Sequence, residues 1–350
     1  MLAEPFEDSR RLTGSNLYFP GTGAALETLR GLVFDEAALE QWQRNVQLAR
    51  TALGWQEDTI ILRRHRIGVS LAFTAPADQL YTATEVNEWA WWSAFGQRID
   101  DSLFHSPGHA AIWDQASALH TLRAAAQAEA RPALIALMQA TAARHLPFLA
   151  DDDEVTIGEG NGSRSWFVDE LPSPDNVPWQ ELHAIPTALV TGSNGKTTTV
   201  RLLASMTRAQ GWRTAHSCTD GVYFEGQALE AGDFSGPTGA RTALRQGQAQ
   251  AAILETARGG MLRRGLAVSH ANAAIVTNIA ADHFGEYGIH DLDDLASVKL
   301  VVARAIDADG LLVLNADDPV LRRQSTVQRC PLGWFSLDFD LPFLVEMRAA

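Results

Sequence analysis

A short glycine-rich stretch carries the residue types that bind phosphate: residues 190–200 read VTGSNGKTTTV. Gly192 and Gly195 allow the backbone to turn tightly and to point its N–H groups inward. Lys196 adds a compact positive charge at the start of an expected helix, whose N-terminus favours anions. In a nucleotide site this lysine would reach the β- and γ-phosphates. The stretch therefore predicts a phosphate-binding loop.

The polar residues of this loop extend the prediction to a metal ion. A hydroxyl of Thr197 or Thr198 would complete the shell of a Mg²⁺ ion, and Ser193 and Asn194 would bind the nucleotide with the rest of the loop. The spacing differs from the usual motif, which would place a glycine where Val190 stands. A strand-to-helix turn without a ligand is the alternative interpretation.

Lysine is rare in this chain, so the position of each lysine is informative. Among 28 basic residues only Lys196 and Lys299 are lysines, and the others are arginines. A GC-rich genome would explain why lysines are few, but not why both occur beside other residues with functional chemistry. An ordinary surface lysine is the alternative at position 299, since lysine stems often lie along apolar surface.

A carboxylate is expected beside the phosphate loop. Glu255 ends the apolar run AAILE, and a divalent cation at the loop needs oxygen ligands of this kind. A solvated glutamate at a strand end is the alternative. Three arginines follow that could contact phosphate or a substrate carboxylate, or simply face solvent from a helix: Arg258, Arg263 and Arg264.

A histidine motif follows another apolar run. His283 lies in TNIAADHFG, flanked by Asn278 and Asp282 at an expected strand end. A lone histidine without such a setting is usually structural or exposed. We therefore treat three other histidines as structural: His216, His270 and His290. Lys299 follows sixteen positions after His283, inside the helix-like stretch LDDLASVKLVVARAI.

Two further loops carry polar residues. Asn315, Asp317 and Asp318 lie in VLNADDP between an expected strand and an expected helix, which Asp317 is placed to cap. The glycine-rich loop at 232–244 contains three polar side chains: Asp233, Ser235 and Thr238. A simple turn explains this second loop as well as a contact with substrate does.

The apolar pattern from residue 186 onward predicts the framework that positions these residues. Four short runs are typical of strands buried on both faces, as in a parallel sheet: TALVT, AAILET, AAIVTN and LLVLN. Helix-length segments fill the gaps at about 196–209, 238–248, 291–307 and 317–324. This order predicts a P-loop-type, doubly wound and mostly parallel α/β domain over 186–325, with ligands at the carboxyl ends of the strands.

The N-terminal part has a different pattern, which predicts a smaller α+β domain of uncertain role over 1–150. It combines an expected helix at 34–53, a strand-like stretch at 58–73 and an alanine-rich helical stretch from about 110 to 148. Clustered tryptophans favour an aromatic core over a ligand site: Trp89, Trp91 and Trp92. Residues 151–185 mix acidic residues with Gly, Ser and Pro, as in a boundary segment that contains a short hairpin.

Composition and charge exclude several classes of function. The chain has 350 residues, of which 46% are hydrophobic, so it can bury a substantial core. Its formal net charge of -14 argues against general binding to nucleic acid or to a membrane surface, since both need a basic footprint. Only two cysteines, no apolar signal core and no apolar stretch of membrane-spanning length make the cytoplasm the expected compartment.

The stretch TGSNGKTT resembles the ATP-binding loop of the Mur ligase family. Further stretches extend the resemblance in order: ETARGGMLRRGL, VTNIAADHFGEYGI, DLASVKLVVARAI and LLVLNADDP. Together they are most similar to the Mur-ligase half of cyanophycin synthetase, over roughly 186–322. RRLTGSNLY, near the N-terminus, more faintly resembles the leading segment of such proteins. Residues 326–350 form a short tail, so we expect the C-terminal lobe of Mur ligases to be absent.

The resemblance implies roles for individual residues. Glu255 would bind Mg²⁺ together with Thr197, and His283 would bind a second Mg²⁺ ion. In many Mur ligases the lysine at the position of Lys299 is carbamylated and helps to hold that second metal, a reaction that a protonated guanidinium does not undergo. An unmodified lysine would instead contact phosphate or substrate. Two asparagines would contact the nucleotide, the second at the adenine base: Asn278 and Asn315.

These residues predict an ATP-dependent ligase that joins an acid to an amino acid. ATP would phosphorylate a small-molecule or peptide carboxylate, and the amine would displace phosphate to form an amide or isopeptide bond. Lys196, Glu255, His283 and Lys299 would be the catalytic residues. One alternative is a non-catalytic or partner-dependent ATP-binding subunit of a split or truncated ligase, with a partner subunit or a homo-oligomer. The other is an unrelated P-loop kinase or synthetase, which would not need His283 and Lys299.

Overall fold

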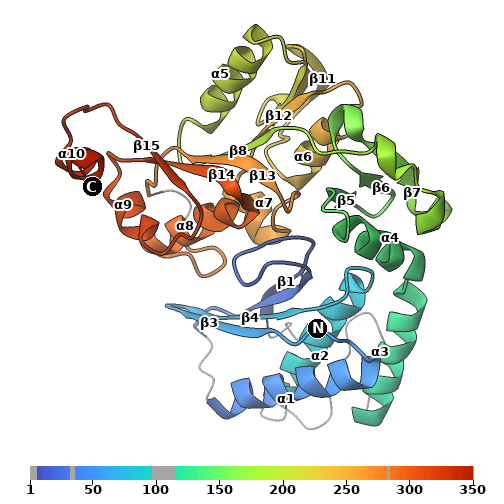
Figure 1. The fold of residues 1–350 in the computed structure, drawn as a ribbon. Helices are drawn as coiled ribbons and strands as arrows, with labels where there is room; N and C mark the ends of the chain where they lie inside the picture. Colours follow the sequence, from blue (N-terminus) through green and yellow to red (C-terminus); the bar gives the residue numbers. More distant parts are fainter. Residues whose placement is uncertain (1–5, 32–35, 97–114, 282–283, 350) are drawn as a thin grey trace. The chain divides into compact units, whose positions relative to one another are not determined.

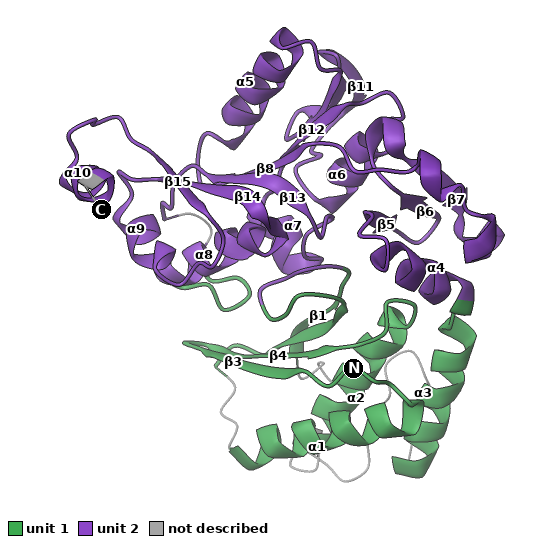
Figure 2. Cartoon of the chain, in the orientation of Figure 1, with its two compact units in different colours: residues 1–13, 18–132, 285–290 green, residues 14–17, 133–284, 291–350 purple. Residues whose placement is uncertain are grey.

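The computed structural model describes residues 6–31, 36–96, 115–281 and 284–349. The chain forms two compact units, which Figure 2 colours separately. Unit 1 comprises residues 1–13, 18–132 and 285–290, and unit 2 comprises residues 14–17, 133–284 and 291–350. These units divide the chain at other points than the predicted domains 1–150, 151–185, 186–325 and 326–350, whose boundaries stay predictions.

Unit 1 is built on a four-stranded antiparallel sheet with the strand order β1-β2-β4-β3 (Figure 1). Its strands are β1 (Phe6–Leu12), β2 (Gly23–Thr28), β3 (Ile60–His65) and β4 (Gly68–Thr74). The predicted strand-like stretch at 58–73 is therefore a hairpin, because residues 66 and 67 form a turn in its middle.

Helices α1 (Glu36–Leu53), α2 (Leu80–Gly96) and α3 (Gln115–Glu129) complete unit 1. Their apolar side chains join those of β2 and β4 in one core, which includes Trp42, Trp89 and Trp91. Each of these three tryptophans is at most 1% exposed. The prediction of an aromatic core is thus confirmed for Trp89 and Trp91, while Trp92 is half-buried.

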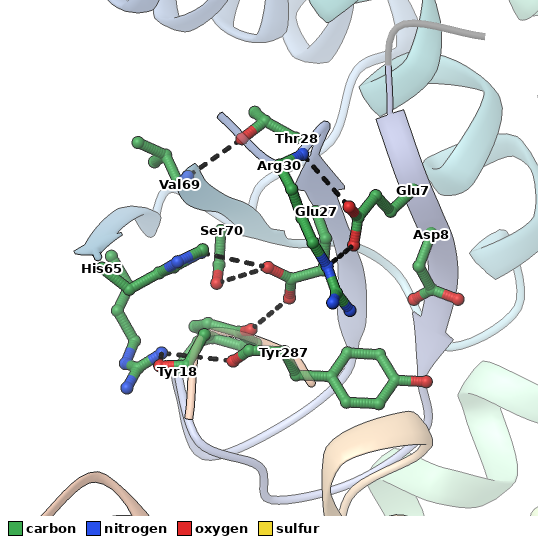
Figure 3. Close-up of polar contacts among 12 residues, drawn as sticks. Glu7, Asp8, Tyr18, Glu27, Thr28, Arg30, His65, Val69, Ser70 and Tyr287 are labelled. Carbon is green, nitrogen blue, oxygen red and sulfur yellow. Dashed lines mark hydrogen bonds and ion pairs between the residues drawn. The ribbon is translucent and has the colours of Figure 1, made fainter. Parts of the chain in front are cut away.

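A polar cluster in unit 1 surrounds the buried carboxylate of Glu27 on β2 (Figure 3). Its Oε1 accepts hydrogen bonds from Arg10 (2.7 Å) and Tyr18 (3.0 Å), and its Oε2 accepts one from Ser70 (2.7 Å). Burial acts to raise the pKa of the Glu27 carboxyl, but His65, Arg10 and Ser70 outweigh it and lower that pKa. The ionised carboxylate therefore ties β1 and β4 to β2 from within the protein.

Unit 2 contains an eight-stranded sheet with the order β11-β10-β9-β12-β8-β13-β14-β15. The strands from β9 to β15 in this order pair in parallel, and β10 and β11 add an antiparallel edge. Their bounds are β8 (Thr187–Thr191), β9 (Thr214–Cys218), β10 (Gly221–Phe224), β11 (Gln227–Ala231), β12 (Ala251–Glu255), β13 (Ala271–Val276), β14 (Ile306–Asn315) and β15 (Leu332–Phe335). The predicted fold class, a mostly parallel α/β sheet preceded by a smaller α+β part, is confirmed.

Further helices precede, connect or follow these strands. They are α4 (Pro132–Ala142), α5 (Lys196–Ala209), α6 (Pro237–Leu244), α7 (Arg258–Arg263), α8 (Leu292–Lys299), α9 (Pro319–Ser325) and α10 (Pro342–Ala349). Figure 1 shows α5 and α6 on opposite sides of the sheet. Two predicted helices end early: α6 stops before Gly247, a weak helix former, and α8 passes into a 3-10 turn over 300–305. None of the helices in the described ranges is both long and apolar enough to cross a membrane.

A small antiparallel sheet occupies the predicted boundary segment and contains the expected hairpin. Its strands are β5 (Phe148–Ala150), β6 (Glu154–Ile157) and β7 (Arg164–Phe167). Arg245, directly after α6, donates hydrogen bonds to Asp151 Oδ2 (2.6 Å), Thr156 Oγ1 (2.8 Å) and the carbonyl of Glu154 (3.0 Å). One guanidinium thus fastens the small sheet to α6.

Glu159 places a second buried carboxyl where the small sheet meets the start of β8. It is 2% exposed, and its Oε2 lies 3.3 Å from the backbone N–H of Ile185 and 3.5 Å from Oγ1 of Thr187. Burial raises the pKa of Glu159 to about 7, and these long hydrogen bonds only partly oppose the rise. Unlike Glu27, this carboxyl gains a proton near neutral pH.

We expect Glu27→Gln to destabilise unit 1 by about 3 kcal/mol, because it takes the buried anion away from the buried guanidinium of Arg10 and leaves it only the half-buried carboxylate of Asp8. Hydrogen–deuterium exchange of the β2 and β4 amides would measure the loss. The lowered pKa means that this stabilisation is present above the unfolded pKa, near 4.5, and is lost as the pH falls through the folded value. Glu7→Gln removes an exposed pair with Arg30 on the same sheet and should cost less than about 1 kcal/mol. Equal protection in both variants would contradict the assignment.

We expect Glu159→Gln to change how stability depends on pH. Since the folded pKa of about 7 lies above the ordinary 4.5, ionising Glu159 costs the folded wild type stability as the pH rises from 5 to 8. The cost approaches about 3 kcal/mol above the folded pKa, and the glutamine variant avoids it. Urea denaturation at pH 5 and pH 8 would compare the two proteins. Exposed Glu181→Gln is the control, and parallel pH profiles for wild type and Glu159→Gln would refute the prediction.

Candidate functional site

The predicted glycine-rich turn joins β8 directly to α5 through residues 192–195. Gly195 caps α5 with left-handed backbone angles (φ 80°, ψ 0°), which favour glycine. At Gly192, φ is 139° and an added Cβ would lie 1.9 Å from Oγ1 of Thr277. The two glycines therefore serve different needs: one permits the turn into the helix, and the other permits the close approach of the chain that leaves β13.

The loop is fastened to the segment that follows β13. The backbone N–H of Ser193 donates to the carbonyl of Asn278 (2.9 Å), and its hydroxyl exchanges two 3.0 Å hydrogen bonds with the backbone of Ala280. Asn278 accepts from the N–H of Asn194 through Oδ1 (3.0 Å) and donates to its carbonyl through Nδ2 (3.2 Å). Thr277 Oγ1 also donates to that carbonyl (2.6 Å). These contacts fix the loop before any ligand binds.

Lys196 and Thr198 occupy the first turn of α5. The Nζ of Lys196 lies 3.2 Å from the carbonyl oxygen of Ser193, so the side chain folds back over the loop. A phosphate at the loop would offer this ammonium a charged acceptor, which forms a stronger hydrogen bond than a carbonyl. Thr198 is exposed at the helix N-terminus. The positions of both residues are compatible with the predicted phosphate contacts.

Glu255 lies at the carboxyl end of β12, next to the loop, and is only 1% exposed. Its Oε2 accepts a hydrogen bond from Oγ1 of Thr197 (2.8 Å). Thr219, directly after β9, donates its hydroxyl to Oε1 (2.9 Å) and its backbone N–H to Oε2 (3.3 Å). The solvated strand-end alternative for Glu255 is therefore excluded. The structure brings together the predicted pair Thr197 and Glu255, and adds Thr219.

The chemistry of these side chains fits Mg²⁺. Mg²⁺ prefers oxygen ligands and is commonly bound by one or two carboxylates together with phosphates and water. Glu255 supplies one carboxylate and Thr197 a hydroxyl with free lone pairs, beside a loop suited to phosphate. In the described ranges no group of three or more His, Cys, Asp and Glu side chains could hold an ion by itself. A cation here would therefore need oxygen ligands from a nucleotide.

The predicted second metal site is only partly described. His283 and Asp282 lie outside the described residues. Lys299 ends α8 and is 2% exposed, so it is not the ordinary surface lysine of the alternative interpretation. Lysine is almost never so deeply buried unless it is paired. The assignment of His283 and Lys299 to a metal site stays a prediction.

The loop after β14 is organised differently from the prediction. Asp318, not Asp317, caps α9: its carboxylate accepts hydrogen bonds from the N–H groups of Val320 and Leu321. The helix begins at Pro319, so its cap must be residue 318. Asn315 donates to the carbonyl of Thr277 (3.0 Å), which ties this loop to the same segment that holds the phosphate loop. Its predicted contact with adenine remains a prediction.

The loop at 232–244 leads into α6, and its two alternative interpretations both stay open. Asp233 accepts hydrogen bonds from the N–H (3.0 Å) and the hydroxyl (2.6 Å) of Ser235, which is buried. Thr238 lies in the first turn of α6. Ser235 and Glu255 both line a small pocket whose other walls are mostly apolar. The arginines predicted beside Glu255 are in α7 or directly after it: Arg258, Arg263 and Arg264.

Sequence reasoning missed Thr219 and Thr277. Thr219 follows β9, whose sequence TAHSC lacks the apolar run that marked the other strands, so its strand end was not expected. The available signal was the turn TDG before the apolar GVYF. Thr277 stands beside Asn278 at an expected strand end, but its backbone contact depends on the path of the phosphate loop. Pairing between strands, rather than spacing along the chain, positions both residues.

Comparison with known proteins agrees with this geometry. Residues 190–339 match the Mur ligase middle domain. The match begins at the end of β8 and covers the phosphate loop, Thr219, Glu255 and Lys299. It confirms, for this segment, the resemblance on which the predicted roles depend.

Similar proteins have longer chains. Cyanophycin synthetase of Geminocystis herdmanii (strain PCC 6308) is 41% identical over 179 residues, which are 51% of this chain and 20% of the synthetase. UDP-N-acetylmuramoyl-L-alanyl-D-glutamate--2,6-diaminopimelate ligase of Xanthomonas oryzae pv. oryzae (strain MAFF 311018) is 30% identical over 236 residues, 64% of this chain and 46% of that enzyme. A solved structure of a ligase with that name aligns over 44% of this chain and 32% of its own, with 23% identity and a TM-score of 0.33. The chain thus spans about a fifth of the length of the cyanophycin synthetase it matches.

We expect Asn278→Ala to weaken nucleotide binding by about 10-fold, because it removes two hydrogen bonds that hold the backbone of Asn194, each worth about 0.5–1.5 kcal/mol. Titration with a fluorescent ADP analogue would measure the change. Asn272→Ala is the matched control, since Asn272 also bonds β8, through the N–H of Thr187 (2.9 Å), but at the opposite end of the strand. Equal losses of affinity in both variants would show that Asn278 has no particular role at the loop.

Proposed function

We propose that this protein is an ATP-dependent ligase that joins a carboxylic acid to an amino acid. The observation that carries the proposal is the contact of Thr197 with buried Glu255 beside the glycine-rich loop, inside a segment that matches the Mur ligase middle domain. Nucleotide chemistry requires phosphate contacts and a cation ligand at one place. In this proposal the loop after β8 would supply the phosphate contacts, and Glu255 at the end of β12 would supply the cation ligand.

The proposed reaction has two steps. A substrate carboxylate oxygen attacks the γ-phosphorus of ATP, which forms an acyl phosphate and releases ADP. The amine nitrogen then attacks the acyl carbon, the C–O bond to phosphate breaks, and the nitrogen loses a proton as the amide forms. Negative charge on the transferring phosphoryl group must be neutralised. Lys196, at the loop, is placed to contribute to this neutralisation.

Other predicted residues would hold the cations. Bound Mg²⁺ would supply a positive charge that screens the phosphates and polarises the transferred group. Thr197 and Glu255 would hold a first ion, and His283 with carbamylated Lys299 would hold a second. The loop residues Gly192, Ser193, Asn194, Gly195 and Thr198, together with Asn278 and Asn315, complete the proposed nucleotide site. In the structure Asn278 acts through the loop backbone, which makes it a positioning residue in this proposal.

The acid is proposed to be a small molecule or a peptide, and the amine an amino acid. The similar proteins are named as a cyanophycin synthetase and as a ligase that uses 2,6-diaminopimelate. The pocket at Ser235 and Glu255 lies beside the proposed cation site, which is where the reacting carboxylate would have to be. A cytoplasmic location, and the absence of nucleic-acid and membrane partners, remain part of the proposal.

We expect the purified protein with Mg²⁺ and ATP to release ADP only when a suitable acid and amine are both present. Lys196→Ala should lower this rate by about 100-fold or more, since it removes a charge aimed at the transferring group. A coupled ADP assay over a panel of amino acids and short acidic peptides would measure the rate. Lys196→Arg is the matched control: it keeps the charge but presents a planar guanidinium, and should not restore the rate.

The same assay separates the alternatives. Lys299→Ala and His283→Ala should lower turnover while nucleotide binding is retained, whereas a generic P-loop kinase would be little affected. Nucleotide binding with turnover only after addition of a second polypeptide would identify a partner-dependent subunit. If neither nucleotide binding nor ADP release differs between wild type and Lys196→Ala, the proposed function is wrong.

A further inference from the structure

Thr219 contacts the proposed site, but the proposed function gives it no role. It lies in the turn between β9 and β10, and its side chain is exposed apart from its contacts with the site. Both of its donors reach the same carboxylate, the hydroxyl at Oε1 (2.9 Å) and the backbone N–H at Oε2 (3.3 Å) of Glu255. A residue that uses two donors on one buried carboxylate fixes where that carboxylate points.

Sheet order explains how Thr219 reaches Glu255. Strand β12 lies between β9 and β8, and all three run parallel. Their carboxyl ends therefore lie at one edge of the sheet, with Thr219 after β9, Glu255 at the end of β12 and the phosphate loop after β8. The carboxylate contacts one threonine from the segment after each neighbouring strand, Thr219 after β9 and Thr197 after β8, and the two hydroxyl oxygens are themselves 3.4 Å apart.

The hydrogen-bond capacity of these groups decides what remains for a ligand. An ionised carboxylate offers about four lone-pair sites, and three donors already use sites of Glu255. The hydroxyl of Thr197 has one hydrogen, which it donates to Glu255, and two lone pairs that this bond leaves available. The contact therefore orients Thr197 with its hydrogen toward the carboxylate and its lone pairs away from it.

We propose that Thr219 is a positioning residue of the cation site: it fixes the carboxylate of Glu255, and Glu255 in turn orients the hydroxyl of Thr197 toward a divalent cation on the nucleotide phosphates. The proposal rests on the nucleotide site of the proposed function, but not on the ligation step. Thr219 itself touches neither the reacting atoms nor the cation. Its hydroxyl oxygen also lies 3.4 Å from Oγ1 of Thr197, but both of its donors are on Glu255, so its effect passes through Glu255, as is usual for groups that orient metal ligands.

A purely structural role makes a different prediction. If Thr219 only compensates for the burial of the Glu255 charge, its loss should reduce stability and weaken nucleotide binding equally with and without Mg²⁺. If it positions Glu255 for the cation, its loss should affect only the part of nucleotide binding that depends on Mg²⁺. The backbone N–H of Thr219 remains in every variant, so Glu255 keeps one partner on that side.

The test uses the full chain and three variants. Thr219→Val removes the hydroxyl at nearly constant volume, and Thr219→Ser restores it. Thr242→Val is the matched control, because the hydroxyl of Thr242 donates to the carbonyl of Thr238 one turn back in α6 and not to the site. Binding of a fluorescent ADP analogue is titrated with MgCl₂, and separately measured in EDTA. Thermal unfolding reports whether each variant is folded.

We expect Thr219→Val to raise the Mg²⁺ concentration for half-maximal stimulation of binding by about 10-fold, the low end of the range for groups that orient metal ligands. ADP binding in EDTA should stay at the wild-type value. Thr219→Ser should return to within about threefold of wild type, since it restores the donor to Oε1. Thr242→Val should match wild type in both conditions.

Four results would overturn the proposal. The first is an unchanged Mg²⁺ dependence in a folded Thr219→Val protein. The second is an equal loss of affinity with and without Mg²⁺, and the third is a Thr219→Ser protein as weak as the valine variant. A wild type whose ADP binding does not respond to Mg²⁺ would also overturn it. Failure of ligation alone would leave these binding results intact, so the two proposals fail separately.

Discussion

The buried carboxylate of Glu255 is the constraint on which the proposed site depends. A charge that is 1% exposed must be compensated by hydrogen bonds, and here the donors are Thr197 and Thr219. Each donor comes from a different strand end, so the carboxylate fixes the spacing of three segments. Because the buried carboxylate needs these hydrogen-bond donors, it gathers the oxygen atoms of Glu255, Thr197 and Thr219 at one place. Such a group of oxygen atoms suits a cation.

Parallel pairing of the strands brings segments that are distant in the sequence to the same edge of the sheet. Four strands are neighbours in the sheet in the order β9, β12, β8 and β13. In the sequence they are spread over residues 187–276. Asn278, after β13, holds the loop that follows β8, while Thr197, at the start of α5, contacts Glu255 at the end of β12. Both flanks of the loop are therefore fixed by the strands on either side of β8, which reduces the ordering that a ligand must bring about.

The sequence predicted those parts of the fold that depend on local pattern. The run TALVT followed by two glycines and Lys-Thr-Thr contains both the strand and the helix start, and α5 spans the expected residues. β9 was missed because TAHSC has no apolar run, although every residue in it is buried. Asp317 was chosen over Asp318 as the helix cap because neighbouring aspartates cannot be distinguished without the helix start. Contacts such as Thr219 with Glu255 depend on strand order, which no spacing along the chain encodes.

The structure also gives a physical reason for lysine rather than arginine at positions 196 and 299. Arginine serves where one side chain must satisfy several acceptors at once: Arg245 bonds three groups of the small sheet, and Arg50 bonds the carbonyls of Thr59 and Thr74. Lys196 instead folds back over the loop, where its ammonium is a compact charge on a flexible stem, 3.2 Å from the carbonyl oxygen of Ser193. Lys299 is buried, and the carbamylation proposed for it requires a primary amine, which arginine lacks. A guanidinium stays protonated in either setting, so neither lysine has arginine as an equivalent.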